Sequence, residues 1–443
     1  MAVVECLIIA AGKGSRLKGI GNSKPLIPVL GVPLIERVIR SAVESGVDEF
    51  YVTTGYNGKL VRSFLAGLST SLRVRITPIV NRDWRKGNGL SVLKAREYVH
   101  GPFLLLMADQ LFDPSIARKL KEVPLGEGEI ALAVDKGMSN PLIDMEDVTR
   151  VKTEGDRIRD IGKGLRDFDG FDTGIFLCTS GIFGAVERCA EEHGDTSLSG
   201  AVRVLAADER AKAVEITGRF WIDVDDLPAL RRAEKALVAN LGEKSNDGPV
   251  SRYLNRPISL SISRRLANRR ITPNQISLFS FFCSVLAAGL FVQRGYLALL
   301  LGGLLAQFAS IIDGCDGEVA RLKFRSSAYG GWLDAVLDRY ADAFLLFCLT
   351  WHAFRDRAES GILWAGFLAV IGSFVVSYTA DKYDSLMAEK VGRISRLRLG
   401  RDMRVFVVFL GAIANQAYLA LVVIATVMNI EAIRRIVICR DRG

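Results

Sequence analysis

The chain has 443 residues, 49% of them hydrophobic, and a formal net charge of +9. This length is too great for one hydrophobic core and predicts two or three domains, while the seven scattered cysteines indicate neither a disulfide framework nor a zinc site. The charge does not indicate nucleic acid, because six arginines and no acidic residue fall within 251–270, directly before a hydrophobic segment, where such clusters bind anionic membrane lipids.

The first half of the chain alternates short apolar runs with segments of helical spacing. Residues 34–44 predict a helix, and strands are predicted at 3–10, 49–54, 74–80 and 103–107. This repeated order predicts an α/β fold over 1–240, with a doubly wound, mostly parallel, Rossmann-like sheet. Ligands of such folds bind at the carboxyl ends of the strands.

A polar segment with two glycines and a proline, 241–250, predicts a linker. Beyond it, 251–443 predicts an all-α polytopic membrane domain with a basic juxtamembrane helix at 251–270 and six transmembrane helices. These spans are expected at about 276–292, 297–312, 337–354, 362–380, 405–414 and 418–438. Arginine and lysine concentrate in alternate loops, so both termini are expected on the cytoplasmic side of the cell membrane.

The first candidate site directly follows the first predicted strand. It is a glycine-rich loop made of Ala11, Gly12, Lys13 and Gly14. Backbone N–H groups of such a loop can approach phosphate oxygens, and Arg16 adds positive charge. A dinucleotide-binding loop would need glycine where Leu17 stands, and a P-loop would end in Gly-Lys-Ser/Thr. The loop therefore predicts a triphosphate site, with a simple strand-to-helix turn as the alternative.

Three further segments accompany this loop: Ser23-Lys24-Pro25-Leu26, Met107-Ala108-Asp109 and Trp221-Ile222-Asp223-Val224-Asp225. Together they resemble the sugar-nucleotide and CDP-alcohol nucleotidyltransferase family over residues 1–238. The resemblance implies that Mg²⁺ on the triphosphate is held by Asp109 and Asp223, with Asp225 as a second choice for the latter. It also implies that Arg16 and Lys24 offset charge on the phosphates.

The same resemblance implies two groups of binding residues. The base would be read at Gly87 and Asn88, and the acceptor would be held by Lys163, Asp172 and Thr173. Ordinary surface turns are the alternative for these residues.

The second candidate site lies where the second predicted span leads into the third. Asp313 and Asp316 are three residues apart, and Asp334 and Asp338 are four apart, so each pair shares one helix face. Charged side chains in lipid are costly and persist when they are paired, bind metal or face a polar cavity. Carboxylate oxygens suit Mg²⁺ or Mn²⁺, and two such ions about 4 Å apart would clamp a diphosphate.

This segment matches every fixed position of the CDP-alcohol phosphotransferase signature, DxxDGxxARx8GxxxDxxxD, and residues 251–443 resemble that family. The resemblance implies that Asp313, Asp316 and Asp334 bind metal. It further implies that Asp338 shares the metal site and acts as general base toward an acceptor hydroxyl. Contacts with the cytidine nucleotide are implied for Gly317, Arg321, Ser327, Thr272 and Asn274.

An arginine-rich segment separates the fourth and fifth predicted spans. Arginine suits phosphate through paired hydrogen bonds, and the arginines here exceed what membrane orientation requires. The segment predicts an acceptor that carries a phosphate, with an ordinary positive-inside loop as the alternative. Its residues are Arg393, Arg396, Arg398, Arg401 and Arg404.

The two halves together resemble the bifunctional inositol-1-phosphate cytidylyltransferase and di-inositol-phosphate phosphate synthase family. The resemblance implies that the first domain converts CTP and inositol-1-phosphate to CDP-inositol and pyrophosphate. The second domain would transfer phosphoinositol to another inositol-1-phosphate and release CMP, in a homodimer formed through the membrane domain. One alternative is a choline, ethanolamine or glycerol CDP-alcohol with a lipid acceptor. Another is a nucleotide-gated transporter, although the spans lack the paired repeats that would favour one.

Overall fold

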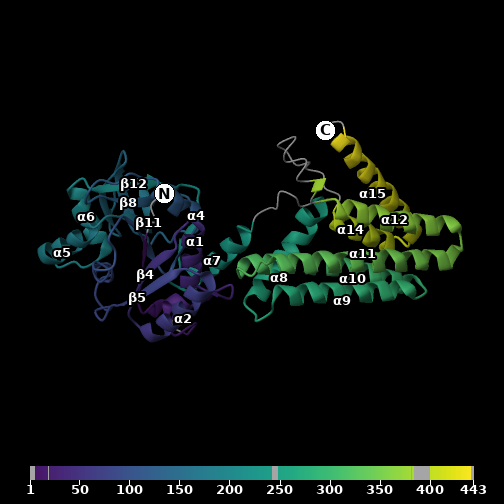
Figure 1. Cartoon of the computed structure of the whole chain (residues 1–443), viewed down its shortest axis with the longest axis horizontal. Coiled ribbons are helices and arrows are strands. Elements are labelled where there is room, and N and C mark those ends of the chain that lie inside the picture. Colours follow the sequence, from purple (N-terminus) through teal and green to yellow (C-terminus); the bar gives the residue numbers. More distant parts are fainter. Residues whose placement is uncertain (1–4, 18, 242–247, 381, 384–399, 441–443) are drawn as a thin grey trace. The chain divides into compact units, whose positions relative to one another are not determined.

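The structure is a computed structural model that describes residues 5–17, 19–241, 248–380, 382–383 and 400–440. The chain divides into two compact units, Met1–Ala236 and Leu237–Gly443 (Figure 1). Strands and helices form the first unit, whereas the described part of the second unit is helical.

A nine-stranded sheet forms the centre of the first unit, with the strand order β5-β4-β1-β6-β11-β8-β12-β10-β9. Its strands are β1 (Glu5–Ala10), β4 (Glu49–Thr54), β5 (Arg75–Val80), β6 (Phe103–Met107), β8 (Ile130–Asp135), β9 (Arg150–Glu154), β10 (Arg157–Gly162), β11 (Gly170–Cys178) and β12 (Ala211–Glu215). Two small sheets pair β2 (Pro28–Val29) with β3 (Val32–Pro33) and β7 (Gln110–Phe112) with β13 (Trp221–Asp223).

The main sheet is mixed rather than mostly parallel, which corrects the prediction from the sequence. Strands β5, β4, β1 and β6 are parallel, but β11 pairs antiparallel with both β6 and β8, and β9 and β10 form an antiparallel hairpin. The segment 150–154 alternates charged residues with Val and Thr, unlike the continuous apolar run of a buried parallel strand. That alternation was the available sign of an antiparallel half.

Helices accompany the sheet at α1 (Leu34–Glu44), α2 (Gly58–Leu72), α3 (Gly89–Leu93), α4 (Pro114–Lys121), α5 (Gly181–His193), α6 (Leu198–Ala207) and α7 (Leu227–Ala239). The predicted bounds of α1 are confirmed, because its apolar residues recur at helical spacing and bury one face. Strand residues Leu7, Phe103 and Phe176 share one buried core with residues of α5 and α6.

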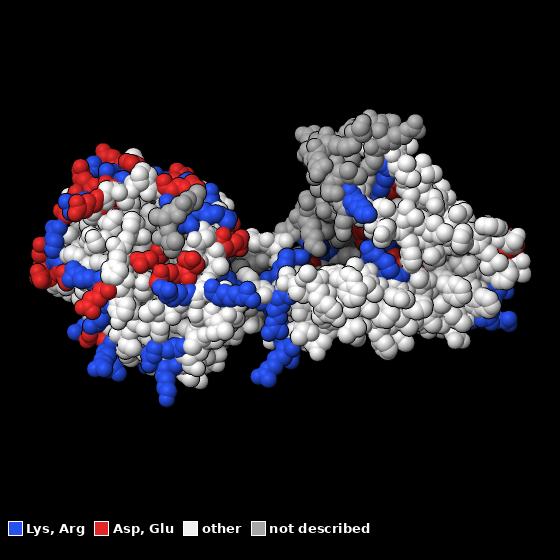
Figure 2. Space-filling model, viewed as in Figure 1, with Lys and Arg blue, Asp and Glu red and all other residues white. Residues whose placement is uncertain are grey.

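The second unit begins with a π-helical turn, Ser251–Asn255, followed by α8 (Arg256–Ala267), α9 (Pro273–Val292), α10 (Tyr296–Leu322), α11 (Ala328–Arg357), α12 (Ser360–Tyr378), α14 (Arg401–Ile413) and α15 (Ala417–Arg440). One apolar core joins α9, α10, α11, α12, α14 and α15, and a smaller one joins α8 to α9 and α10. Figure 2 shows that the outward surface of these helices carries few charges along its middle.

Each of the six predicted spans coincides with a helix of this unit, although the fourth and fifth predicted spans extend past the ends of α12 and α14. Among the described residues, three helices are long and apolar enough to cross a membrane: α9, α10 and α12, with mean hydropathy of 2.0, 1.7 and 1.9. The 13 residues of α14, at about 1.5 Å each, extend only about 20 Å, less than the ~30 Å hydrocarbon core. The second unit is therefore a helical, membrane-associated region, and the count of six crossings stays a prediction.

Two candidate active sites

The glycine-rich loop begins where β1 ends, at the carboxyl edge of the parallel strands. Ala11 is buried, whereas Gly12 and Lys13 are exposed. Gly14 has a φ of +63°, and a Cβ added there would collide with the Lys24 side chain. Both the left-handed backbone and the close approach of Lys24 therefore require glycine at this position.

Three carboxylates meet beside this loop. Asp109 follows β6, and the pairing of β13 with β7 sets Asp223 opposite Gln110. The Val224 N–H donates to the Asp109 carbonyl at 3.0 Å, which ties the two segments together. One ligand oxygen from each of Asp109, Asp223 and Asp225 lies within 4.8 Å of the others. The sequence left Asp223 and Asp225 as alternatives, and the structure brings both to the cluster.

Lys24 lies among these carboxylates, with Nζ in contact with Asp109 and Asp225. Burial lowers the pKa of Lys24, but the adjacent Asp109, Asp223 and Asp225 outweigh burial and raise this pKa above its usual value. Burial, followed by the nearby Asp109, raises the pKa of Asp223 well above that of an ordinary aspartate. These closely spaced carboxylates beside the glycine-rich loop offer oxygen ligands for a divalent cation. A bound cation would reduce the repulsion between the carboxylates.

A cavity next to the carboxylates contains the predicted acceptor residues Lys163 and Asp172. Nζ of Lys163 lies 2.5 Å from Oδ1 of Asp147. Arg16 also contacts Asp147, and its Nη2 lies 3.2 Å from Oδ2 of Asp225. Asp147 therefore lies between Arg16, which was predicted to offset phosphate charge, and Lys163, which was predicted to hold the acceptor. It lies in a loop without a motif, so no sequence pattern marked it.

Asp172 and Thr173 are neighbours on β11, but their side chains lie in different environments. Thr173 is fully buried and its hydroxyl donates to the Ala133 carbonyl at 2.8 Å, so it supports the sheet and does not line the cavity. Asp172 does line the cavity, and burial raises its pKa to about 6. The Gly174 N–H donates to Asp172 at 2.7 Å, at an irregularity in the β11 pairing where Gly174 has a φ of +68°.

Gly87 and Asn88 lie at the start of α3 and do not line this cavity. The Gly87 N–H donates to Oγ1 of Thr196 at 3.0 Å, and Oδ1 of Asn88 accepts the Leu198 N–H at 2.8 Å. A Cβ at Gly87 would collide with the Thr196 carbonyl. The turn is therefore held firmly against the start of α6.

The second site forms between α10, which carries Asp313 and Asp316, and α11, which carries Asp334 and Asp338. Ligand oxygens of Asp313, Asp334 and Asp338 lie within 4.8 Å of one another, and Asp316 adjoins this cluster through a side-chain hydrogen bond with Asp334. Oδ1 of Asp334 is buried and has no hydrogen-bond partner among the described residues. An unpartnered carboxylate oxygen within a carboxylate cluster fits a divalent cation.

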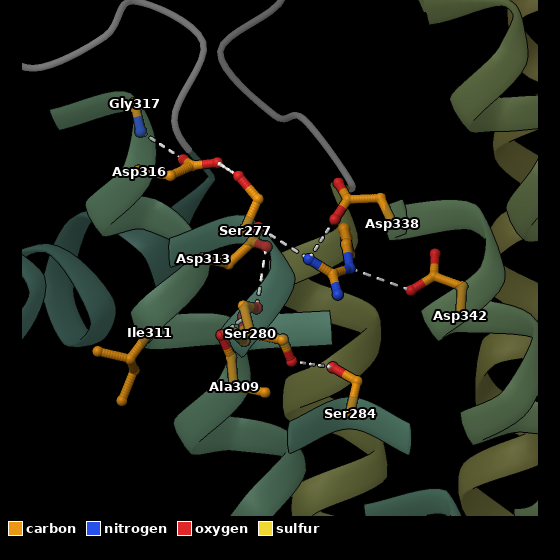
Figure 3. Close-up of polar contacts among 12 residues, drawn as sticks. Ser277, Ser280, Ser284, Ala309, Ile311, Asp313, Asp316, Gly317, Asp338 and Asp342 are labelled. Atoms are coloured by element: carbon orange, nitrogen blue, oxygen red, sulfur yellow. Dashed lines mark hydrogen bonds and ion pairs between the residues drawn. The ribbon is translucent and has the colours of Figure 1, made fainter. Parts of the chain in front are cut away.

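Arg401, the first residue of α14, contacts both carboxylate-bearing helices. Its Nη1 lies 2.8 Å from Oδ2 of Asp313 and 2.6 Å from Oδ1 of Asp338, and its Nε lies 3.3 Å from Oδ1 of Asp342 (Figure 3). Arg404 is buried and pairs with Asp342 at 2.6 Å, away from the cavities. The remaining arginines of the predicted acceptor site lie outside the described residues: Arg393, Arg396 and Arg398.

Two cavities flank these aspartates. One, of about 170 Å³, is lined by several residues predicted to contact the nucleotide, together with two aspartates: Asn274, Gly317, Arg321, Ser327, Asp316 and Asp334. Thr272 is not among them, because its side chain accepts the Gln275 N–H and caps α9. The other cavity, of about 210 Å³, contains Asp313, Asp338 and Arg401. Its remaining wall is Gly248, Ser251, Asn255, Arg256, Ser259, Ser310, Gly314, Glu318, Arg321 and Asp402.

Comparison with known proteins agrees with this two-part arrangement. Residues 6–208 match the MobA-like NTP transferase domain, and residues 270–431 match the CDP-alcohol phosphatidyltransferase family. A solved structure, the inositol-1-phosphate CTP transferase from T. maritima, is 26% identical, with a TM-score of 0.48, and covers 53% of this chain and 95% of that one.

Two relatives match almost from end to end. The bifunctional IPC transferase and DIPP synthase of Aquifex aeolicus is 34% identical over 440 residues, covering 97% of this chain and 97% of that protein. The protein of the same name from Rubrobacter xylanophilus is 37% identical over 438 residues, covering 98% of this chain and 96% of that protein. At this identity and coverage, the chain belongs to the family of bifunctional IPC transferases and DIPP synthases.

Proposed function

We propose that the chain is a bifunctional transferase that first makes CDP-inositol from CTP and inositol-1-phosphate, and then transfers phosphoinositol to a second inositol-1-phosphate. The observation that carries the proposal is that each unit contains a cluster of three carboxylates in contact with a basic side chain and beside a polar cavity. Membership of the bifunctional family supports the pairing of the two reactions.

In the first reaction, a phosphate oxygen of inositol-1-phosphate attacks the α-phosphorus of CTP. A new P–O bond forms, the bond from the α-phosphorus to the bridging oxygen breaks, and pyrophosphate leaves. The loop 11–14 is placed to bind the triphosphate, while Arg16 and Lys24 are placed to offset its growing negative charge. Lys163 and Asp172 line the cavity in which the acceptor would lie.

In the second reaction, a hydroxyl of the acceptor inositol-1-phosphate attacks the β-phosphorus of CDP-inositol. The hydroxyl proton passes to Asp338, the bond to the phosphate of CMP breaks, and CMP leaves. Asn274, Arg321 and Ser327 are placed to hold the nucleotide in the cavity that also contains Asp316. Arg401 lines the cavity on the Asp338 side, which supports a role for Arg401 in binding the acceptor's own phosphate.

Both carboxylate clusters fit Mg²⁺, with Mn²⁺ as the second choice. The ligands would be Asp109, Asp223 and Asp225 in the first unit. In the second unit they would be Asp313, Asp334 and Asp338, with Asp316 beside them. When bound, these ions would neutralise phosphate oxygens and make the phosphorus atoms better electrophiles.

The cavity beside Asp338 favours a soluble acceptor over a lipid. Among the described residues, those that line it are polar, charged or glycine, and none of them is aliphatic or aromatic. A phosphorylated polyol can exchange its water shell for such groups, whereas an acyl chain gains nothing there. This observation supports inositol-1-phosphate over the alternative of phospholipid synthesis.

We further propose six membrane crossings with both termini and both sites on the cytoplasmic side, 241–250 as the linker, and a homodimer formed through the membrane domain. The arginines of 251–270 support this orientation, since basic residues concentrate on the cytoplasmic side.

The experiment that tests the function follows phosphorus-containing species by NMR while purified protein acts on CTP, Mg²⁺ and inositol-1-phosphate. Pyrophosphate release, then CMP and a new phosphodiester, would establish both reactions, and Asp338→Asn should stop at CDP-inositol. Turnover only with choline phosphate or glycerol phosphate would refute the inositol assignment. Transfer to a lipid instead of a soluble product would refute the second acceptor.

A further inference from the structure

Three serines interrupt the apolar sequence of α9, the helix that faces the catalytic aspartates of α10. Ser277, Ser280 and Ser284 are at most 4% exposed. Their spacing of three and four residues places them on one face of the helix. A buried hydroxyl in an apolar helix costs free energy unless it has a partner, so the partners indicate what this face does.

Two of these serines contact the aspartates directly. The hydroxyl of Ser277 lies 2.5 Å from Oδ2 of Asp316, and the hydroxyl of Ser280 lies 3.1 Å from Oδ1 of Asp313 (Figure 3). Ser277 therefore contacts Asp316 and Ser280 contacts Asp313, and both of these aspartates lie on α10. Ser280 also lies 3.0 Å from the Ala309 carbonyl, and one hydroxyl proton can serve only one of these acceptors at a time.

The two carboxylate oxygens of Asp313 contact different partners. Oδ1 faces Ser280 on α9, while Oδ2 faces the interior of the site, where Arg401 approaches to 2.8 Å. A hydrogen bond to one oxygen restricts rotation of the carboxylate and directs the other toward a ligand. Groups of this kind commonly orient the residues that bind a metal.

We infer that Ser277 and Ser280 are positioning residues for the metal-binding carboxylates of the second site. The inference rests on the proposed function, because it takes Asp313 and Asp316 to serve that site. It assigns a role to α9 that the aspartate signature does not contain. Loss of either hydroxyl removes one of the contacts that orient its carboxylate, while Asp316 keeps the Gly317 N–H and Asp313 keeps Arg401. Metal affinity then falls about 10- to 100-fold.

Ser284 supplies a matched control on the same face. Its hydroxyl donates to the Ser280 carbonyl at 3.1 Å, one turn back along the helix, and it has no hydrogen bond to an aspartate among the described residues. Ser284→Ala therefore removes the same atom from the same buried stripe without freeing a carboxylate.

The test titrates Mn²⁺ into the detergent-solubilised full chain and measures free Mn²⁺ by electron paramagnetic resonance. Asp109→Asn and Asp223→Asn form the background, so that the first unit does not contribute. Ser277→Ala and Ser280→Ala are expected to weaken Mn²⁺ binding at least about tenfold. Ser284→Ala should bind as the background protein does, and Ser277→Thr should restore most of the affinity that Ser277→Ala loses.

Thermal unfolding in EDTA separates positioning from packing, because all three alanine variants should then unfold alike. Unchanged Mn²⁺ binding in Ser277→Ala and Ser280→Ala, or an equal loss in Ser284→Ala, would overturn the inference. Asp313→Asn shows whether a negative result concerns the metal site or only the serines. If Asp313→Asn and both serine variants leave Mn²⁺ binding unchanged, the proposed metal site is wrong. If Asp313→Asn weakens Mn²⁺ binding and the serine variants do not, only the role of the serines is wrong.

Discussion

Replacing Arg401 by Gln removes a cation that contacts three carboxylates at once. Its side chain is 13% exposed and lies 2.8 Å from Asp313, 2.6 Å from Asp338 and 3.3 Å from Asp342. Breaking a buried ion pair from one side costs about 3–5 kcal/mol, because the opposite charge stays buried without a partner. Asp313 keeps 23% exposure, so water offsets part of this cost, and about 3 kcal/mol is expected.

For a unit of this size, about 3 kcal/mol corresponds to a fall in Tm of about 6–12 °C. The assay is thermal unfolding of the detergent-solubilised protein in EDTA and in saturating Mg²⁺. The destabilisation should be full in EDTA and should shrink with Mg²⁺, since a bound divalent ion supplies the missing positive charge. Arg339→Gln is the control, because Arg339 is 38% exposed and 3.6 Å from Asp338, and such surface pairs contribute about 0–1 kcal/mol. Equal Tm values for Arg401→Gln and the parent in EDTA would refute the reasoning.

Three further predictions concern the first unit. Lys24→Ala should lower the rate of pyrophosphate release at least about 100-fold, while the second reaction, started from added CDP-inositol, should continue; a parallel loss of both would contradict separate sites. Trp221→Phe removes the N–H that donates to Asp135 at 2.8 Å and should lower the free energy of unfolding in urea by about 1–3 kcal/mol; unchanged unfolding would show that this bond is dispensable. The hydrogen bond from Lys212 lowers the pKa of Glu129 from 4.5 to about 2, so its stabilisation is present above pH 4.5 and disappears as the pH falls through about 2. Glu129→Gln should therefore cost about 1–2 kcal/mol at pH 7 after discounting for partly exposed partners, and the two unfolding curves should converge near pH 2.

Local patterns predicted those parts of the fold that depend on neighbouring residues. The helix Leu34–Glu44 and the strands Glu49–Thr54 and Phe103–Met107 have the predicted bounds, because amphipathic spacing and apolar runs are set within each segment. The antiparallel half of the sheet was missed, since the pairing of β11 with β6 and β8 joins segments far apart in the chain. Pairing of that kind leaves only weak alternation in the sequence.

The site shows the same division between local and distant information. Spacing alone put Asp313 beside Asp316 and Asp334 beside Asp338 on their helices, but it could not show that Asp313, Asp334 and Asp338 are the three whose ligand oxygens meet. The contact between Asp342 and Arg401 joins residues 59 positions apart. Serines of α9 and Asp147 belong to no motif, so only tertiary structure reveals their partners.

The two sites share one electrostatic arrangement although their folds are unrelated. In each, a basic side chain from a different element contacts the three-carboxylate cluster: Lys24 from the short 3-10 helix Lys24–Leu26, and Arg401 from the start of α14. Counting only these groups as ionised, each site keeps two negative charges, which one Mg²⁺ ion neutralises, and Arg16 brings a further positive charge to Asp225 at the first site.

The basic side chains offset the repulsion between the carboxylates, and in the proposed reactions the same side chains bind phosphate. A metal ion that takes over the carboxylates would release Lys24 or Arg401 toward the substrate. Each basic residue lies on a different element from its carboxylates. Metal and phosphate would then favour each other's binding at both sites. The metal replaces the basic side chain as the partner of the carboxylates, and the phosphate replaces the carboxylates as the partner of the basic side chain.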